Sequence, residues 1–463
     1  MTGDSTHQHQ GPRGAIGPAA RAALVGSTLE WYDFSLYATA AALVFNRVMF
    51  ATTDPAVGTI LAFGTFAVGF LARPVGGILF GHFGDRLGRK KILVLTLLIM
   101  GSATALIGVL PTYDRIGILA PILLVTLRIV QGLGAGAEFG GAAVLSVEHA
   151  APESRGVQGS WTVVGVFAGL LLASVTFTAL LQMPEDDFLT WGWRLPFLAS
   201  ILIVGVALVI RLRVAESPEF TTMKATDAVS AFPLGVLIRT QKRPLAVVMA
   251  SQAGQSAVSY VYLTFIIAYA TQQLDLSPSA ATISVSCAAI AAMVTMPLFG
   301  ALSDRIGRRT VILGGMVFSA AFAFPFFAIA NIGTNASVII AMVIGVGVGS
   351  AAMLGPSAAY FTELFPPQVR FSGLGLGREL AGALSGGFAP TVAAALVVQS
   401  GGASWPVAAL LLVVAILTGA VVWWGPETLN RRPNSQRPVE VSLSEPVGMS
   451  ARTRANEMVR KQP

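Results

Sequence analysis

Seven ionisable residues lie inside long apolar runs of the sequence, where a charge is unfavourable. They are Glu30, Asp33, Arg73, Arg128, Glu138, Arg378 and Glu379. On insertion scales a charged side chain at the centre of a membrane helix costs about 2.5–3.5 kcal/mol, so seven unpaired charges would cost on the order of 20 kcal/mol. These residues must therefore pair with one another or line a wet cavity. Their carboxylates can exchange protons, and their arginines can bind anions.

Three of the apolar runs carry polar side chains at helical spacing. The stripes are Gly26, Glu30, Asp33 and Tyr37 in the first, Arg128, Gln131, Ala135 and Glu138 in the second, and Gln252, Gln255, Ser259 and Tyr262 in the third. Residues three or four positions apart share one face of a helix. Because a face in contact with lipid would be apolar, each stripe is predicted to face the interior of the protein.

The composition excludes a water-soluble globular protein. Of the 463 residues, 54% are hydrophobic and 11% are charged, and the mean hydropathy is +0.71. Soluble domains carry about 25% charged residues. A membrane-spanning helix needs about 20 mostly apolar residues, and the sequence predicts twelve of them. The predicted spans are 22–49, 57–81, 92–111, 118–148, 156–182, 193–213, 244–271, 279–301, 311–331, 336–362, 372–398 and 406–424.

The distribution of basic residues predicts the orientation. Twelve spans place both termini on one side, and 24 of the 30 basic residues fall in the loops and tails of that side, among them Arg211 and Arg213. Three fall in loops on the other side and three within spans. Cytoplasmic loops carry the excess of Lys and Arg, so both termini are expected to be cytoplasmic. The net charge of +7 is then a topology signal and not a sign of nucleic-acid binding.

Other kinds of site have no support in the sequence. The single cysteine, Cys287, allows neither an intramolecular disulfide nor a metal–thiolate cluster. No histidine lies in the middle of a span, so carboxylates are expected to carry any proton. A nucleotide-binding loop and a Ser/His/Asp arrangement are also missing. The sequence predicts neither an enzyme nor a cofactor or metal site.

The chain divides into two similar halves. The segment GHFGDRLGRK at 81–90 returns as GALSDRIGRR at 300–309. Five residues of the fourth-span region, Gly134, Gly140, Glu148, Pro152 and Arg155, recur as Gly349, Gly355, Glu363, Pro367 and Arg370. We therefore expect an all-α membrane protein of two six-helix bundles, 21–213 and 244–424, joined by a cytoplasmic loop at 214–243, with disordered cytoplasmic tails at 1–20 and 425–463. A binding site is expected at the midplane between such repeats.

Several of these motifs resemble those of a known family. The loop G-x-x-x-D-R-x-G-R-[KR], present in both halves, resembles the signature of the major facilitator superfamily, and RIVQGLG from Arg128 resembles its R-x-x-x-G-x-G motif. GSTLEWYDFSLYA at 26–38, FLARPVGGILFGHFGDRLGRK at 70–90 and ESPEF at 216–220 resemble the metabolite–proton symporter family, which includes shikimate, α-ketoglutarate, citrate and proline/betaine permeases. The resemblance implies proton coupling at Arg128 and a central cavity surrounded by spans one, four and seven.

The sequence also departs from these relatives. The osmolyte permeases of the family carry a C-terminal coiled coil, whereas residues 425–463 contain Pro426, Pro433, Pro438 and Pro446 and no sustained heptad. Span eleven has Arg378 and Glu379 where relatives mostly have uncharged polar residues. Span five lacks the Gly-Pro motif typical of superfamily antiporters, which favours symport.

The polar stripes give hypotheses for the transport site. Asp33 is the expected proton-carrying carboxylate, with Glu30 or Glu138 as alternatives, and its protonation would release Arg128 to bind a substrate carboxylate. The expected substrate-binding residues are Arg128, Gln131, Tyr32, Tyr37, Gln252, Gln255, Tyr262, Arg378 and Glu379, with Trp31 shaping the pocket. Structural pairing of Asp33 with Arg128, or of Arg378 with Glu379, is the alternative, as is helix–helix hydrogen bonding by the glutamines. Arg73 is expected to act in conformational change or at the headgroup level.

The repeated motifs are expected to form a conformational latch on the cytoplasmic face. Its predicted members are Gly81, Asp85, Arg86, Gly88, Arg89, Glu148, Arg155, Asp304, Arg305, Arg308, Glu363 and Arg370. Asp85 is expected to contact the N-terminus of a neighbouring helix, and the basic residues to pair across the face. A plain positive-inside anchor is the alternative for the basic members.

Taken together, the sequence predicts a monomeric carrier in the cell's inner (plasma) membrane. Its partners would be protons, a small organic acid and the lipid bilayer, and its activity proton-coupled uptake by alternating access. A carrier for zwitterionic osmolytes, an efflux antiporter and a non-transporting sensor remain the alternatives.

Overall fold

The computed structural model describes residues 16–50 and 55–429, and within these ranges the regular elements are helices. Six long helical segments form the N-terminal half: α1 (Pro18–Ala40), which continues through a π-helical turn into α2 (Asn46–Val48), then α3 (Pro55–Leu87), α4 (Arg89–Val109), α6 (Leu119–Glu148), α7 (Arg155–Leu180) and α9 (Arg194–Arg213). Short helices α5 (Tyr113–Ile116) and α8 (Glu185–Asp187) lie in the connections.

The C-terminal half repeats this arrangement. Its helices are α12 (Lys242–Tyr260), which continues through the π-helical segment Val261–Phe265 into α13 (Ile266–Gln272), then α14 (Pro278–Ile306), α15 (Arg308–Ala330), α16 (Asn335–Ile344) with α17 (Ala351–Leu354) and α18 (Ser357–Leu364), α19 (Arg370–Gln399) and α20 (Trp405–Trp424). Between the halves lie α10 (Pro218–Ala225) and α11 (Pro233–Thr240).

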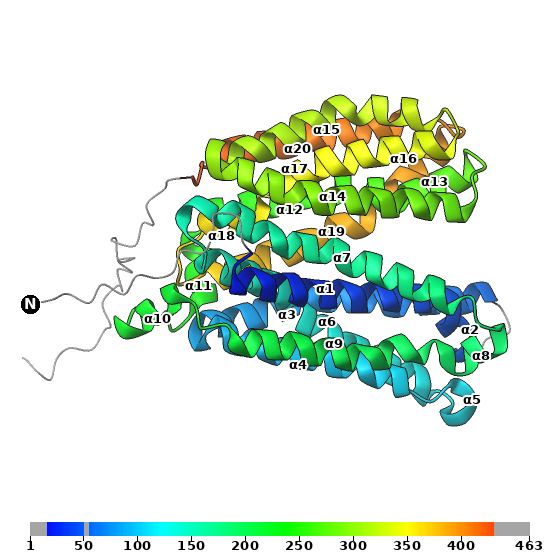
Figure 1. Cartoon of the computed structure of the whole chain (residues 1–463), viewed down its shortest axis with the longest axis horizontal. Coiled ribbons are helices and arrows are strands. Elements are labelled where there is room, and N and C mark those ends of the chain that lie inside the picture. Colours follow the sequence, from blue (N-terminus) through cyan, green and yellow to red (C-terminus); the bar gives the residue numbers. More distant parts are fainter. Residues whose placement is uncertain (1–15, 51–54, 430–463) are drawn as a thin grey trace, which may run out of the picture. The chain divides into compact units, whose positions relative to one another are not determined.

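All twelve predicted spans correspond to long helical segments, which run side by side in Figure 1. In the described part of the chain, nine of these segments are long and apolar enough to cross a membrane by length and composition alone. The segments of α1 and α12 are not among the nine, and both carry polar stripes predicted from the sequence. Their polarity indicates that they are stabilised by other helices more than by lipid.

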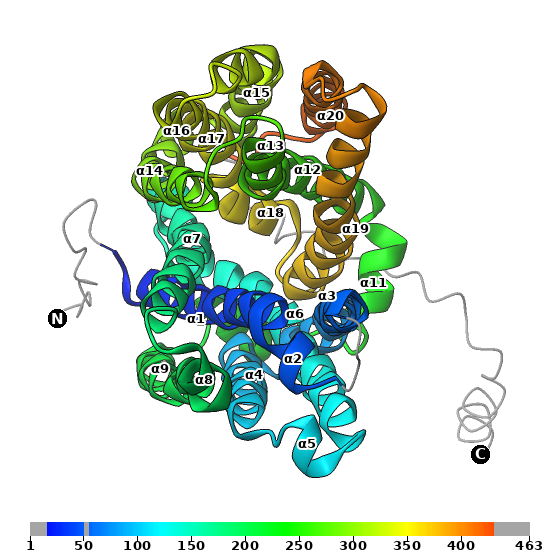
Figure 2. The ribbon, with the colours of Figure 1, turned by 90° about the vertical axis from the view of Figure 1, so that its right-hand side faces the viewer.

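Two helix pairs join the halves. Helix α3 packs against α19, and α7 packs against α14, as the view along the helices in Figure 2 shows. The first pair is especially close, because a Cβ atom at Gly375 would lie 2.3 Å from the carbonyl oxygen of Gly77. Only glycine permits such backbone contact. The two halves therefore touch through main chain at this crossing.

The predicted cytoplasmic loops and helices α10 and α11 lie at the same end of the helices in Figure 1, which we call the latch end. Gly88 and Gly307 interrupt the chain there with φ values of 111° and 110°, in the left-handed region that favours glycine. The first separates α3 from α4, and the second separates α14 from α15. The repeated motif thus forms the same kind of turn in both halves.

Both predicted tails are shorter than expected. Helix α1 already begins at Pro18, and Glu427 and Thr428 are held by hydrogen bonds to α15 and to Glu363. The prediction of disorder is wrong for these residues because their polar groups have fixed partners. The remainder of the predicted tails, 1–15 and 430–463, lies outside the described residues.

Candidate functional site

A cavity of about 560 Å³ is lined by helices of both halves. Its lining includes Phe70 and Arg73 of α3, Phe139 of α6 and Trp31 of α1, together with residues of α7, α12, α14 and α19. It extends to Leu181, just beyond α7, and to Thr282 near the start of α14. Both positions are far from the latch end along their helices. The cavity therefore lies toward the opposite end.

Four of the predicted substrate-binding residues line this cavity: Gln252, Gln255, Arg378 and Glu379. Trp31 also lines it, as predicted. Hydroxyl groups cover much of the remaining polar surface, from Ser35, Thr39, Ser174, Thr178, Ser256, Ser259, Thr264, Thr282, Ser286 and Ser357. The lining thus offers both charged groups and neutral hydrogen-bonding groups to a small polar solute.

Four charged residues form one connected group, which we call the cavity-floor network. Arg73 forms ion pairs with Glu30 through Nη2 and with Glu379 through Nε, the latter at 2.8 Å. Glu379 also pairs with its neighbour Arg378. The guanidinium of Arg378 lies 3.5 Å above the ring of Phe139. Because Glu30, Arg73 and Phe139 belong to the N-terminal half, the network crosses the interface between the halves.

The cavity-floor network balances two positive charges with two negative charges in a nearly dry place. Arg73 is 3% exposed, Glu30 1% and Glu379 5%. Removing one partner of a buried pair leaves the other uncompensated, at a cost of about 3–5 kcal/mol. The prediction for Arg73 assigned it to conformational change or the headgroup level. Instead it lies at the cavity, and its position inside an apolar run was the signal that could have identified it.

A second polar chain lies within the N-terminal half, and we call it the N-half relay. Thr104 donates a hydrogen bond to Asp33 at 2.7 Å, Gln131 Nε2 donates to Thr104 Oγ1 at 2.7 Å, and Arg128 donates to Gln131. The guanidinium of Arg128 lies 4.0 Å from the centre of the Tyr37 ring. The predicted partners Asp33 and Arg128 are therefore connected through two neutral side chains.

The polar stripe of α1 does not face the cavity as predicted. Trp31, Ser35 and Thr39, on another face of the helix, line the cavity, while Asp33 and Tyr37 are buried inside the N-terminal half. Charged groups within a membrane bundle turn toward partners, and Thr104 and Thr65 supply partners there. The prediction that the stripes line the cavity is likewise wrong for three further residues. They are Tyr32, Arg128 and Gln131, all buried but outside the lining.

Glu138 is held by a residue that the sequence assigned to a loop. Arg211 donates to both carboxylate oxygens of Glu138 and, at 3.1 Å, to the carbonyl oxygen of Leu93. Arg211 is 1% exposed, so its prediction as a surface loop charge is wrong. The pair lies beside Gly26 of α1. Because Arg211 binds both oxygens of the Glu138 carboxylate, this ion pair has a structural role in the described conformation.

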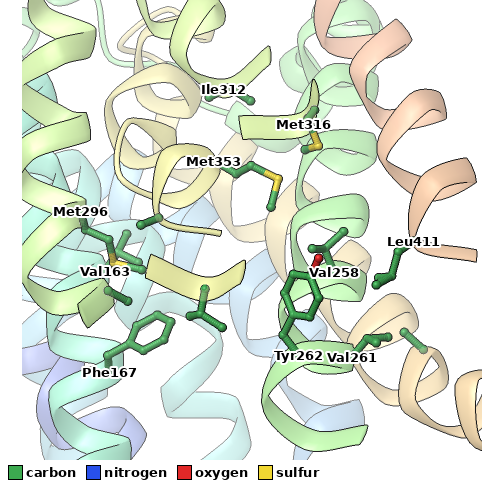
Figure 3. Packing of buried hydrophobic residues seen from close by; sticks show 14 of the residues in the cluster. Val163, Phe167, Val258, Val261, Tyr262, Met296, Ile312, Met316, Met353 and Leu411 are labelled. Carbon is green, nitrogen blue, oxygen red and sulfur yellow. The ribbon is translucent and has the colours of Figure 1, made fainter. Parts of the chain in front are cut away.

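Tyr262 was predicted to bind substrate but lies outside the cavity lining. Its ring packs against Phe326, with the ring centres 4.5 Å apart, in the apolar core of the C-terminal half shown in Figure 3. Met296, Met316 and Met353 belong to the same core. The lining continues from Ser259 through Tyr260 and Leu263, so Tyr262 lies on a different face of the helical segment.

The predicted contact of Asp85 with a helix N-terminus is present. Its carboxylate accepts hydrogen bonds from the backbone N–H groups of Phe371 (3.2 Å) and Ser372 (2.8 Å) and from the Ser372 hydroxyl (2.8 Å). These groups belong to the start of α19, in the other half. Backbone N–H groups at a helix start attract negative charge. Gly81 lies one turn earlier, against the backbone of Phe371 and Ser372.

Asp304 makes the corresponding contact in the opposite direction. It accepts from the backbone N–H groups of Gly156 (2.8 Å) and Val157 (2.9 Å) at the start of α7, and it pairs with Arg308 at 2.6 Å. Each half thus places one carboxylate on a helix start of the other half. We call these contacts, with their arginines, the two latch clusters.

The latch clusters differ in the arginine that crosses the interface. Arg370 of the C-terminal half pairs with Glu148 at 2.8 Å and with Glu219 of α10. Its repeat counterpart Arg155 approaches Glu219 as well, at 3.4 Å. Within the clusters, Arg89 lies 3.6 Å from both Asp85 and Glu148, and Arg308 lies 3.4 Å from Glu363. Two other predicted members, Arg86 and Arg305, are exposed.

The sequence analysis did not predict two capping carboxylates at the latch end. Glu216 accepts from the backbone N–H groups of Arg89 (3.0 Å) and Lys90 (3.2 Å), and Glu427 accepts from that of Arg308 at 2.8 Å. The neighbouring Ser217 and Thr428 donate to Glu148 and Glu363. The recurrence of Glu-Ser and Glu-Thr after the sixth and twelfth spans was a signal for both.

Comparison with family models covers both halves of the chain. Residues 19–232 match the family described as Sugar (and other) transporter, and residues 248–463 match the Major Facilitator Superfamily. Among the described residues, no group of three or more His, Cys, Asp or Glu side chains is arranged to hold a metal ion. The motif-based resemblance to this superfamily is confirmed.

Two relatives show what kinds of protein the chain is similar to. It is 40% identical over 420 residues to the shikimate transporter of Escherichia coli K12, covering 88% of this chain and 94% of the relative. It is 32% identical over 445 residues to the proline/betaine transporter of the same organism, covering 93% and 88%. Both belong to the kinds of permease that the motifs predicted.

Solved structures share the fold. The proton:xylose symporter XylE bound to 6-bromo-6-deoxy-D-glucose is 19% identical and aligns with a TM-score of 0.72 over 90% of this chain and 97% of XylE. A partially occluded, inward-open structure of XylE from E. coli aligns with a TM-score of 0.63. The predicted twelve-helix fold of two six-helix bundles is confirmed.

Proposed function

We propose that this chain, which belongs to the major facilitator superfamily of multi-pass membrane transporters, takes up a small organic carboxylate together with a proton. As a member of that superfamily it is a transporter and not an enzyme. The observation that carries the proposal is the cavity-floor network, because the buried Arg73 and the partly buried Arg378 lie at the base of a largely apolar cavity that also carries hydroxyl groups, which suits a small hydroxylated acid. Arginine binds carboxylates through a planar fork of donors that stays charged.

The N-half relay supports Asp33 as the proton-carrying residue. Of the three carboxylates predicted for this role, Glu30 pairs with Arg73 and Glu138 pairs with Arg211. Asp33 instead accepts from the neutral hydroxyl of Thr104, and its Oδ1 has no hydrogen-bond partner among the described residues. A buried carboxylate with little compensation favours its neutral, protonated form. Glu30 and Glu138 remain the alternatives.

The latch clusters support alternating access. In the described conformation both clusters hold the halves together at the latch end, while the cavity lies toward the opposite end. We propose that the latch end is cytoplasmic, since most of the basic residues in the described part of the chain lie there, and that the chain resides in the inner (plasma) membrane. The structure then represents an outward-facing state, and rocking of the two bundles opens the latches.

A zwitterionic osmolyte is the second candidate substrate. The cavity-floor network presents carboxylates beside its arginines, and a zwitterion carries both complementary charges. One relative is a proline/betaine transporter. Uptake that rises with the osmolality of the medium would favour this candidate.

The test is uptake in energy-depleted, lightly buffered cells that express the full-length protein. External pH is recorded while shikimate, 2-oxoglutarate or proline is added to cells with the wild-type protein or with Asp33→Asn. We expect alkalinisation with an acid, lost in the variant, while exchange of labelled for unlabelled acid continues because exchange needs no net proton movement.

Two outcomes would contradict the proposal. Entry of the acid without a pH change, equal in both proteins, would indicate a facilitator. Alkalinisation that persists in Asp33→Asn but disappears in Glu30→Gln would move the coupling role to the cavity-floor network.

A further inference from the structure

We propose that Arg73 and Arg378 form a carboxylate subsite that Glu379 occupies as a built-in anion, and that the substrate's carboxylate displaces Glu379 on binding. The inference rests on the proposed function and specifies where the acid group binds and what it competes with.

The geometry of Glu379 is that of a bound ligand. One carboxylate oxygen accepts from Arg73 Nε at 2.8 Å, and the other accepts from Arg378 Nη1. The two arginines belong to different halves, on α3 and α19. A carboxylate that bridges two guanidinium groups in this way uses the same oxygen geometry as a substrate acid would.

Arg73 also has unused binding capacity. It lines the cavity, it is 3% exposed, and its Nη1 has no hydrogen-bond partner among the described residues. A buried donor without a partner costs free energy, so an arriving oxygen atom is favoured there. Arg378 is fixed by stacking on Phe139, at 3.5 Å. Both cations therefore stay in place when Glu379 moves.

The neighbouring side chains indicate how the rest of the solute is held. Gln252 lies 4.0 Å from the position of a Cβ atom at Gly382, one turn beyond Arg378 on α19. Gln255 Oε1 has no hydrogen-bond partner among the described residues. Both glutamines line the cavity beside Ser256 and Ser259. A hydroxylated carbon skeleton attached to the carboxylate would meet these amide and hydroxyl groups.

Internal competition has a measurable consequence. A site that its own anion fills most of the time binds an external anion more weakly, in proportion to the fraction of time it is empty. If Glu379 fills the subsite about 90% of the time, its removal strengthens acid binding about tenfold. A neutral ester does not compete for the arginines and gains nothing.

The experiment measures equilibrium binding to the purified full-length protein by isothermal titration calorimetry. The probes are shikimate and benzoate, each compared with its methyl ester, and 2-oxoglutarate, compared with its dimethyl ester. We expect Glu379→Gln to bind at least one acid about tenfold more tightly, and Arg378→Gln to bind it at least about tenfold more weakly. Ester binding stays unchanged in both.

Two further variants keep the result interpretable. Glu185→Gln removes the same charge from an exposed pair with Arg47 and should leave acid binding unchanged. Arg378→Gln/Glu379→Gln removes one charge of each sign, so the network stays neutral and the protein should fold. This double variant keeps Arg73 but lacks Arg378, so it is expected to bind the acid more weakly than Glu379→Gln does.

The proposal is overturned if acid and ester respond alike to Glu379→Gln, or if none of the three acids binds the wild-type protein. Its failure is distinguishable from failure of the proposed function. Acid binding that follows the expected pattern without proton uptake in cells would refute symport but support the subsite. Proton-coupled uptake without the difference between acid and ester would support symport but refute the subsite.

Discussion

The two ends of the interface between the halves use charge differently. At the latch end, Asp85 and Asp304 are repeat counterparts, and each binds backbone N–H groups of the opposite half. At the cavity floor the charges are not repeated, because Arg378 and Glu379 correspond to Val163 and Val164 in the first half. The comparison indicates that rocking of the two bundles requires equivalent contacts from both halves. A solute that binds in one orientation requires only one charged site.

The largest expected effect is at the cavity floor. Arg73→Gln leaves Glu30 and Glu379 without their shared cation, so we expect a loss of about 3–5 kcal/mol in stability and no transport. Thermal unfolding in detergent measures the first, and uptake in cells measures the second. Adding Glu30→Gln removes the carboxylate that has lost its partner, leaves the Arg378–Glu379 pair intact, and should recover most of the lost thermal stability. An unchanged unfolding temperature in the single variant Arg73→Gln would contradict a stabilising role of the cavity-floor network.

The next effect tests the latch clusters against each other. Asp85→Asn and Asp304→Asn each remove a charged hydrogen-bond acceptor. Hydrogen bonds to a charged group contribute about 1.5–3 kcal/mol, so both variants should populate the latch-open state more than the wild-type protein does. Asp85 should have the larger effect, because it accepts from a side chain of the other half as well as from two backbone N–H groups.

The measurement is the labelling rate of a cysteine introduced at Ala358, which is fully buried, in a chain whose Cys287 is changed to serine. Gly159 of the other half lies next to it. Faster labelling in both variants is expected, and equal protection in wild type and variants would show that the latches do not control opening.

A smaller effect compares the two capping carboxylates. Glu216→Gln and Glu427→Gln each remove a negative charge from a helix N-terminus, which is worth about 1 kcal/mol. Because the caps are repeat counterparts, we expect similar decreases in thermal stability. A large effect of one and none of the other would show that the halves depend on the latch end unequally.

The smallest effect is expected at Glu219. It meets both Arg155 and Arg370, but its side chain is 22% exposed, and partly exposed pairs contribute about 1 kcal/mol or less. Glu219→Gln should therefore change Ala358→Cys labelling less than Asp85→Asn does. A larger change would place the control of opening in α10 and not in the repeated aspartates.

Sequence reasoning predicted what depends on periodicity and repetition. Apolar runs locate all twelve helical segments, and the repeated loop predicts the contact of Asp85 with a helix start. It also identified Arg378 and Glu379 as cavity residues, because charges in only one half suggest a function specific to that half.

What it missed depends on pairing between distant segments. The stripe on α1 has the correct spacing, but spacing does not say which neighbour a face meets, and Asp33 meets Thr104 instead of the cavity. Arg211 looks like a loop charge until Glu138 is placed beside it. Tyr262 has a spacing compatible with its stripe, but the cavity lining continues through Tyr260 and Leu263 and Tyr262 packs against Phe326.

The polar face of α1 also bears on how the protein is made. Glu30 and Asp33 belong to α1, which leaves the ribosome before α3 and α4, and a carboxylate left alone in a membrane costs about 2.5–3.5 kcal/mol. The partner of Glu30, Arg73, is synthesised only with α3, and that of Asp33, Thr104, only with α4. We therefore expect α1 to reach its lowest free energy in the bilayer only after α3 and α4 have been inserted beside it.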